Sequence, residues 1–307
     1  MSLFSGVYTA IITPFTSTGD IDWESFERLV KIQINAKVSG VVPCGTTGES
    51  PTISKEDKKK LISLACTLVK GSDVQVIAGT GSNNTAESVD LTQYAKDAGA
   101  NACLIVNPYY NRPSQAGLIA HVKEIAKVGL PIVLYNIPGR SGVNMTVDTV
   151  VKLATTEPMV RAIKDATGGV DAAAELACVC PGLTVLSGDD GLTLPFMSVG
   201  AKGVISVVSN IAPKPLVEMV ACALKNDFAK ARVIHQKLLP LVKSLFIETN
   251  PTPTKHALKS LSLIPSDAVR LPLVNIQEAS KNAVEAEIKN ALQQFGVNDF
   301  DSYQSNE

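Results

Sequence analysis

Lys164 is the residue whose type and position most directly indicate chemistry. It closes an apolar run, residues 159–164, and is followed by Asp165 and a glycine-containing loop. If the run is a strand, the amine lies at the strand's carboxyl end, where barrel enzymes carry their catalytic groups. A water-poor site disfavours the ammonium form, and the neutral amine attacks ketones to form a Schiff base. A lone strand lysine more often extends its charge into solvent, so the neighbouring loops must decide between these interpretations.

A loop with two glycines and two adjacent threonines follows another predicted strand. Residues 44–50 read Cys-Gly-Thr-Thr-Gly-Glu-Ser and contain Thr46 and Thr47. Backbone N–H groups in such a loop point into a concavity, and the two hydroxyls add hydrogen bonds, so a small carboxylate would fit there. The alternative is a glycine-rich turn without a ligand. No Gly-Lys pair follows, so the loop is not a P-loop.

Two aromatic loops also follow predicted strands. Residues 107–113 hold Tyr109 and Tyr110 between two prolines, and residues 134–142 hold Tyr135 and then Arg140 in what we predict to be a tight Pro-Gly loop. Tyrosine hydroxyls relay protons, and a guanidinium group grips a carboxylate with two hydrogen bonds. The alternatives are tyrosines packed at an interface and an arginine in a surface ion pair. Together with Lys164, these loops predict a site that condenses carbonyl compounds.

The remaining polar residues do not indicate a metal site. Asp189 and Asp190 follow a predicted strand, but sequence neighbours rarely converge on one ion, so a turn with helix capping is favoured over Mg²⁺. Cys44 has no histidine placed to activate it and is interpreted as packing. The three histidines lie on predicted helices, away from strand ends, and receive no catalytic role: His121, His235 and His256.

Short apolar runs alternate with helical patterns along the chain. The runs are continuous rather than alternating, as in parallel strands that helices cover on both faces. Eight strand–helix units in order predict an α/β fold, a (β/α)8 TIM barrel. A doubly wound open sheet is the alternative, weakened because Gly79-Thr80-Gly81 does not continue into a full dinucleotide-binding fingerprint. The predicted strands begin near residues 7, 41, 74, 102, 132, 160, 184 and 203, and the predicted helices span 23–35, 55–69, 85–98, 115–128, 147–155, 171–178, 192–198 and 215–224.

The last quarter of the chain has only helical patterns. Residues 229–247, 254–263 and 279–295 are the predicted helices, and a barrel needs no further strand. We therefore divide the chain into a catalytic barrel, residues 1–227, and a helical region, residues 228–307, packed on the barrel or in a subunit interface. Residues 298–307 are polar and are expected to fray.

Composition limits the protein class. The 307 residues carry a formal net charge of -1 and are 45% hydrophobic, which suits one large globular core. A charge near zero argues against a nucleic-acid partner, which requires a basic surface. The start of the sequence lacks a basic signal-peptide segment, and no apolar stretch is long enough to span a membrane. The six cysteines are scattered, so we expect reduced thiols and a cytoplasmic location.

Five motifs resemble those of the pyruvate-dependent Schiff-base aldolase superfamily and, within it, the dihydrodipicolinate synthase family. The resemblance covers nearly all of residues 3–295. It implies a lyase that condenses pyruvate with L-aspartate-4-semialdehyde to give 4-hydroxy-tetrahydrodipicolinate, the first committed step of diaminopimelate and lysine biosynthesis. The motifs are residues 45–49 (Gly-Thr-Thr-Gly-Glu), 108–113 (Pro-Tyr-Tyr-Asn-Arg-Pro), 135–140 (Tyr-Asn-Ile-Pro-Gly-Arg), 163–168 (Ile-Lys-Asp-Ala-Thr-Gly) and 187–190 (Ser-Gly-Asp-Asp).

The resemblance also implies roles for individual residues. Lys164 would form the imine, and Tyr135 would donate and accept protons at the reacting carbon. Thr46 would link Tyr135 to Tyr110 of the partner subunit. No cofactor is implied, because the imine itself is the electron sink. The implied substrate-binding residues are Thr47, the backbone of Ile205 and Gly188 for pyruvate, and Arg140 for the carboxylate of the semialdehyde.

Family members often bind lysine as an inhibitor, and Asn83, Glu87 and Tyr109 match that pattern. Lys55 and Lys58 stand where lysine-sensitive bacterial members often carry histidines, so we expect weak or absent inhibition. The resemblance further implies a homotetramer built from tight dimers.

Three alternative functions stay open. Sialic acid lyases and keto-deoxy-sugar-acid aldolases share the lysine and tyrosine but bind polyhydroxylated aldehydes, usually without an arginine in this loop and with Ser-Thr in place of Thr-Thr. A catalytically idle barrel with a binding role would have no reason to keep both Lys164 and Tyr135. A metal-dependent aldolase would need a histidine and carboxylate cluster at strand ends, which the sequence lacks.

Overall fold

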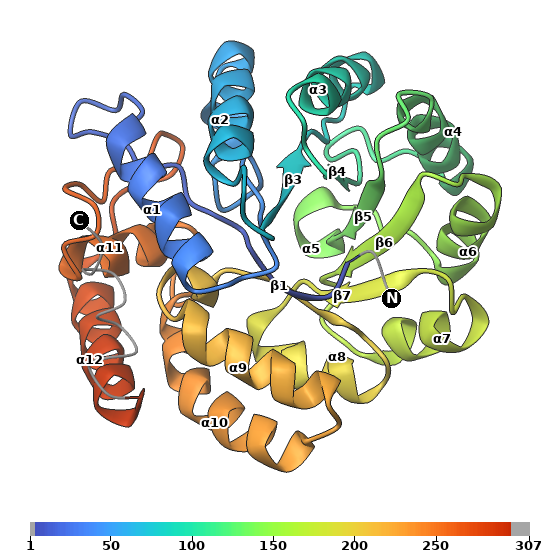
Figure 1. Cartoon of the computed structure of the whole chain (residues 1–307). Coiled ribbons are helices and arrows are strands. Elements are labelled where there is room, and N and C mark those ends of the chain that lie inside the picture. The colour runs from blue at the N-terminus through green and yellow to red at the C-terminus, as the bar shows by residue number, and fades with distance from the viewer. Residues whose placement is uncertain (1–3, 296–307) are drawn as a thin grey trace.

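The computed structural model describes residues 4–295, and its centre is a closed parallel barrel (Figure 1). Within these residues each strand bonds to the next strand in the sequence, and β8 closes on β1. The predicted (β/α)8 barrel is therefore confirmed, and the open sheet is excluded. The strands are β1 Gly6–Thr9, β2 Gly40–Val41, β3 Gln75–Gly79, β4 Ala102–Val106, β5 Ile132–Asn136, β6 Val160–Asp165, β7 Thr184–Ser187 and β8 Gly203–Ser206.

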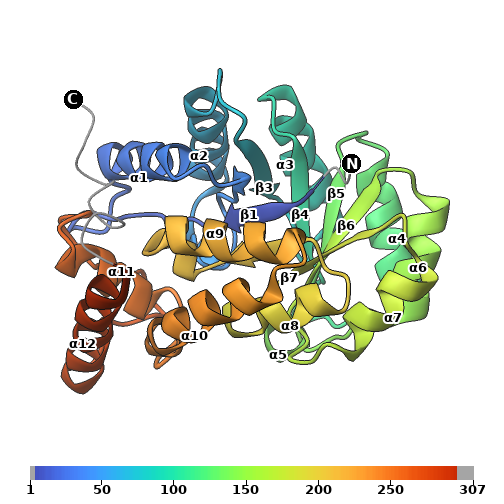
Figure 2. The same ribbon diagram turned by 60° about the horizontal axis from the view of Figure 1, so that its bottom comes forward.

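Helices connect successive strands and cover the outside of the barrel (Figures 1 and 2). Five of them begin at a polar residue whose side chain accepts a hydrogen bond from a backbone N–H of the first turn, so local sequence fixes their starts. These caps are Asp22, Ser54, Asn84, Ser114 and Thr146. The helices between strands include α1 Trp23–Asn35, α2 Lys55–Leu68, α3 Thr85–Asp97, α4 Gln115–Ala126, α6 Val147–Thr156, α7 Asp171–Val179 and α8 Thr193–Ser198, and α9 Pro213–Leu224 follows β8.

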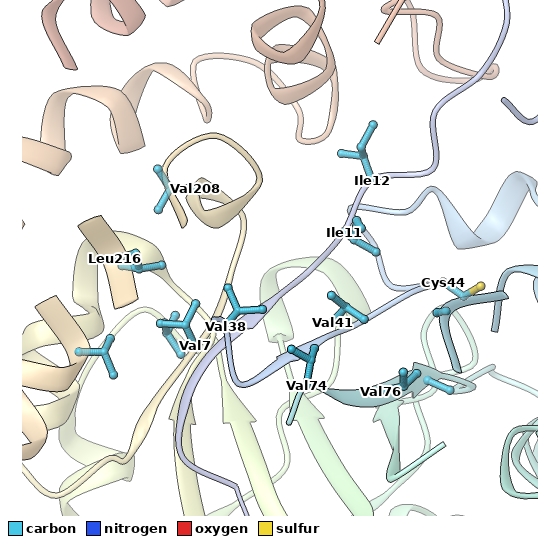
Figure 3. Packing of buried hydrophobic residues seen from close by; sticks show 14 of the residues in the cluster. Val7, Ile11, Ile12, Val38, Val41, Cys44, Val74, Val76, Val208 and Leu216 are labelled. Carbon is cyan, nitrogen blue, oxygen red and sulfur yellow. The ribbon is translucent and has the colours of Figure 1, made fainter. Parts of the chain in front are cut away.

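The apolar core has two layers because alternate strand residues face opposite sides of the sheet. The larger layer lies between the barrel and its helices, and Figure 3 shows part of it, including Val41, Val74 and Val76. The smaller layer fills the barrel and includes Tyr135 and Ala162. Lys164 follows Ala162 by two positions, so the alternation places its side chain inside the barrel at the carboxyl end of β6.

Three further helices follow the barrel: α10 Phe228–Ser244, α11 Thr252–Ser260 and α12 Glu278–Phe295. In Figures 1 and 2 they lie on one side of the barrel, with α12 outermost, and α12 packs on α10 and α11. Helix α10 packs on α9 of the barrel. On this basis we propose that the barrel, through residue 227, and the helical region described here, residues 228–295, form one structural unit. The predicted frayed segment, 298–307, lies outside the described residues.

Candidate active site

Lys164 and Tyr135 lie side by side at the carboxyl ends of β6 and β5. The two residues are register partners across these strands, and Lys164 Nζ lies 4.2 Å from the centroid of the Tyr135 ring. Both are buried, with 6% and 5% of their surface exposed. Within residues 4–295, no carboxylate lies within ion-pair distance of the Lys164 amine. A buried amine against an aromatic face, without a counterion to hold it, is well placed to act as a nucleophile.

Because Gly188 has no side chain, it leaves space for the side chain of Lys164. A Cβ atom added at Gly188 would lie 3.1 Å from Lys164 Cε and 2.8 Å from the Cβ of Ala166. The backbone N–H of Gly188 donates to Asp165 O at 2.6 Å, so β7 cannot easily move away from β6. A side chain at position 188, which is predicted to bind substrate, would therefore crowd the Lys164 side chain.

A cavity of about 540 Å³ opens at the carboxyl ends of the strands. Thr46, Tyr135 and Arg140 line it, so the structure brings together the threonine loop, the end of β5 and helix α5 (Pro138–Ser141). Lys164 does not line the cavity itself; it lies against the ring of Tyr135, which does. The charged residues that line the cavity are three cations and one carboxylate, which favours anionic ligands. These are Lys55, Lys58, Arg140 and Glu87.

The threonine loop, residues 44–50, is held by contacts from other parts of the chain. Thr47 is buried, and its hydroxyl accepts a hydrogen bond from Asn250 Nδ2 at 3.0 Å. Thr13 Oγ1 donates to the carbonyl of Gly48 at 2.8 Å. Sequence reasoning missed Asn250 and Thr13, since neither lies in a motif or beside a predicted site residue.

Arg140 lies on a short helix, α5 Pro138–Ser141, so the prediction of a tight loop was wrong. Pro138 at the first position favours a helical start, and Gly142, with φ of 73°, ends the helix in the left-handed region. Arg140 is exposed and lines the cavity. Among the residues described here, no carboxylate pairs with it. Its guanidinium group is therefore free to bind a ligand carboxylate.

Tyr110 does not line the cavity within a single chain. It is 92% exposed, and its φ of 71° lies in the left-handed region, which is rare for an aromatic residue. Asn111 Nδ2 donates to Asn83 O at 2.9 Å, and Asn83 Nδ2 donates to Tyr109 O at 3.2 Å. These bonds tie the backbone on both sides of Tyr110 to the loop after β3.

Two of the three residues predicted to bind an inhibitor line the same cavity as Tyr135 and Arg140. Glu87 and Tyr109 line it, whereas Asn83 does not. Glu87 accepts a hydrogen bond from Ser82 Oγ at 2.6 Å. Lys55 pairs with Asp90 at 2.8 Å, and this hydrogen bond raises the pKa of Lys55.

Asp189 and Asp190 cap backbone groups, as predicted, and do not converge on one point. Asp189 accepts a hydrogen bond from Gly191 N, whereas buried Asp190 accepts from Val207 N and Val208 N at 2.9 and 3.0 Å. These bonds fix the chain just after Ile205 on β8, which is buried in the interior layer with Tyr135.

Cys44 is buried, and burial raises the pKa of its thiol to about 12, which fits the prediction of a packing role. Residues 4–295 contain no group of three or more histidine, cysteine, aspartate or glutamate side chains that could hold a metal ion. No helix in this part of the chain is long and apolar enough to cross a membrane.

Comparison with known proteins gives one consistent family. The sequence profile of the Dihydrodipicolinate synthetase family matches residues 3–291. The 4-hydroxy-tetrahydrodipicolinate synthase of Methanocaldococcus jannaschii is 48% identical over 296 residues, which cover 96% of this chain and all of that protein.

Two solved structures show the same agreement in three dimensions. The 4-hydroxy-tetrahydrodipicolinate synthase from Methylacidiphilum fumariolicum SolV superposes with a TM-score of 0.93 and 44% identity, covering 96% of this chain and 98% of that one. The DHDPS structure from Cyanidioschyzon merolae with lysine bound gives a TM-score of 0.92 and 36% identity, covering 95% and 99%.

Proposed function

The chain belongs to the Dihydrodipicolinate synthetase family, and on that premise we propose that it condenses pyruvate with L-aspartate-4-semialdehyde to give 4-hydroxy-tetrahydrodipicolinate. This lyase reaction serves diaminopimelate and lysine biosynthesis. The observation that carries the proposal is the buried amine of Lys164 against Tyr135, in a barrel whose relatives carry this activity. The sugar-aldehyde alternative has no such support among these relatives.

The first half of the reaction activates pyruvate. The Lys164 amine attacks the ketone carbon, and water leaves to give the imine. Loss of a proton from the methyl carbon then gives an enamine. The ring of Tyr135 lies 4.2 Å from Lys164 Nζ and carries a hydroxyl group, so we assign the proton transfers to Tyr135. Thr46 and Tyr110 of the partner subunit would pass the proton to solvent, and Thr47, Gly188 and the Ile205 backbone would hold the pyruvate carboxylate.

The second half joins the two substrates. The enamine carbon attacks the aldehyde carbon of the semialdehyde and forms the new carbon–carbon bond, while the aldehyde oxygen takes up a proton. The amino group of the bound semialdehyde then attacks the imine carbon, displaces Lys164 and closes the ring. Arg140, exposed at the cavity and without a carboxylate partner among residues 4–295, would bind the semialdehyde's carboxylate.

Pyruvate consumption with different acceptors tests the proposed function. L-aspartate-4-semialdehyde, N-acetylmannosamine and glyceraldehyde are offered separately to the purified protein with pyruvate. We expect rapid pyruvate loss only with the semialdehyde. Loss with a sugar-type aldehyde instead would keep the Schiff-base chemistry and replace the acceptor. No loss with any aldehyde, on folded protein, would refute the enzymatic assignment.

Arg140→Ala is expected to lower kcat/KM for the semialdehyde by about 30- to 200-fold, because a charge-assisted hydrogen bond pair contributes about 2–3 kcal/mol. The KM for pyruvate and the borohydride trapping of pyruvate should stay unchanged. Arg161→Ala is the matched control, since Arg161 is an exposed arginine on β6 away from the cavity lining. Unchanged semialdehyde kinetics would remove Arg140 from the site.

We also propose that lysine inhibits this enzyme weakly or not at all. Lys55 and Lys58 line the cavity beside Glu87 and Tyr109, and two cations there repel the ammonium groups of lysine. Within residues 4–295, no carboxylate lies within ion-pair distance of Lys58. We expect little loss of activity at submillimolar lysine and greater inhibition of a Lys55→His, Lys58→His double variant at neutral pH. Strong submillimolar inhibition of the unaltered protein would contradict this.

We also propose that the protein is cytoplasmic and forms a homotetramer made of tight dimers. Tyr110 is 92% exposed in the single chain, so a proton relay through it requires a second subunit. Sedimentation equilibrium should give a tetramer mass, and dilution to monomers should lower activity. A fully active monomer would exclude Tyr110 from the relay.

A further inference from the structure

A buried ion pair joins the helical region to the threonine loop. Lys255 on α11 pairs with Glu49, the residue two positions after Thr47. Both side chains are buried, with 0% and 2% of their surface exposed. The Lys255 amine also donates to Ala268 O at 2.9 Å and lies 3.8 Å from the centroid of the Phe15 ring. None of these groups takes part in the reaction described above.

Arg270 holds the other side of the same carboxylate. Its backbone N–H donates to Glu49 Oε2 at 2.9 Å. Its guanidinium group donates to the carbonyl of Thr52, which follows the threonine loop, and to that of Gly19. The carboxylate of Glu49 is thus held from two directions by residues that lie more than 200 positions away in the sequence.

The backbone at Glu49 shows why the loop needs an outside constraint. Glu49 has φ of 52°, in the left-handed region that a residue other than glycine adopts only at a cost. Cys44, at the other end of the loop, has φ of 59°. Thr46 and Thr47 lie between these two strained positions, so their direction depends on the contacts that keep the loop in this conformation.

Desolvation of the buried Lys255 ammonium group opposes the attraction between Lys255 and Glu49. Burial lowers the pKa of Lys255 to about 8, although Glu49 beside it acts in the opposite direction, so desolvation outweighs the attraction. A lysine whose folded pKa lies below its unfolded pKa costs folding stability at neutral pH, and that cost disappears as the pH rises from about 8 to 10.5. Buried ion pairs can often be replaced by apolar side chains without loss of stability.

We propose that Glu49 and Lys255, with Arg270, are positioning residues that hold Thr46 and Thr47 in their working orientation. The helical region is then part of the catalytic apparatus, although none of its residues in this cluster touches the reacting atoms. This inference rests on the proposed role of the threonines in binding pyruvate and relaying protons.

The test compares Glu49→Gln, Lys255→Met and the double variant with the unaltered protein. The double variant removes both charges and keeps similar volumes, so no unpaired charge stays buried. Lys259→Met is the matched control: Lys259 lies on the same helix, and its ion pair with Asp267 at 2.8 Å is half-exposed. Each protein is measured for its melting temperature, for the pyruvate concentration that gives half-maximal borohydride trapping, and for proton exchange at the pyruvate methyl group.

We expect the double variant to melt at or above the temperature of the unaltered protein. Its half-maximal pyruvate concentration should rise, and its methyl exchange rate should fall, each at least about tenfold, since misplacing a binding group by about 1 Å has effects of this size. Lys255→Arg keeps a cation beside Glu49, so its half-maximal pyruvate concentration and its methyl exchange rate should lie between those of the double variant and those of the unaltered protein. Lys259→Met should change neither value.

A folded double variant with unaltered pyruvate trapping and methyl exchange would overturn the proposal. If the double variant does not fold, the same measurements are made on Glu49→Gln, which is the mildest of the changes. Failure of both to fold would also overturn it, because the pair would then serve stability rather than positioning. Pyruvate is the only substrate in these measurements, so an inactive unaltered protein in the semialdehyde assay would refute the proposed function without deciding this inference.

Discussion

Lys164→Ala should abolish borohydride trapping of pyruvate and lower turnover by more than about 1,000-fold, the effect typical of losing a covalent nucleophile. The variant should still fold, because the exchange removes a buried amine that has no ion-pair partner among residues 4–295. The neighbouring Ala162 shows that a small side chain fits the barrel interior. The measurements are mass spectrometry after reduction with pyruvate present, and steady-state turnover.

Lys164→Arg is the matched comparison for this variant. Arginine keeps a cation in place of the lysine, but it is too weak a nucleophile to form an imine with a ketone. We therefore expect it to be as inactive as Lys164→Ala. Persistent labelling of either variant would remove Lys164 from the Schiff-base role, and labelling at another lysine would identify the true nucleophile.

Tyr135→Phe should lower turnover by about 100- to 10,000-fold, the range for losing a general acid–base group. Pyruvate trapping should continue, because phenylalanine keeps the ring that lies 4.2 Å from Lys164 Nζ and loses only the hydroxyl. The expected loss thus falls on the proton transfers. Turnover and the extent of trapping are measured on the same preparation.

Tyr94→Phe is the control for Tyr135→Phe. The Tyr94 hydroxyl hydrogen-bonds with Ser63 Oγ at 2.7 Å between two outer helices, away from the cavity lining. Its loss should leave turnover unchanged. If Tyr135→Phe retained most of its turnover, the proton-transfer role would have to belong to another group, and Thr46 is one of the other hydroxyl-bearing residues that line the cavity.

Local sequence contains enough information to predict the barrel. Continuous apolar runs marked the buried parallel strands, and the helical patterns between them marked the connecting helices. The structure adds that Ser54 and Thr146 cap two of these helices. Because parallel strands in a barrel all end at one rim, assigning Lys164, Tyr135 and Arg140 to strand ends was sufficient to predict that they share a site. Helix α5 was missed, because four residues with a proline and a glycine carry too weak a periodic signal.

Tertiary structure decided the contacts that set the geometry of the site. The register of β5 against β6 places Tyr135 beside Lys164, and Gly188 on the loop after β7 leaves room for that lysine. The roles assigned to all of the site residues, Lys164 and Tyr135 included, stay predictions.

The sequence by itself determined the strands, most of the helices and which side chains are candidates for the chemistry, since these follow from short-range periodicity and from residue chemistry. It could not indicate that Asn250 binds Thr47, which lies 203 positions away, or that Lys255 pairs with Glu49. Such contacts depend on how the helical region packs against the barrel. No local pattern encodes that packing, because its free energy comes from burying surfaces that are distant in the chain.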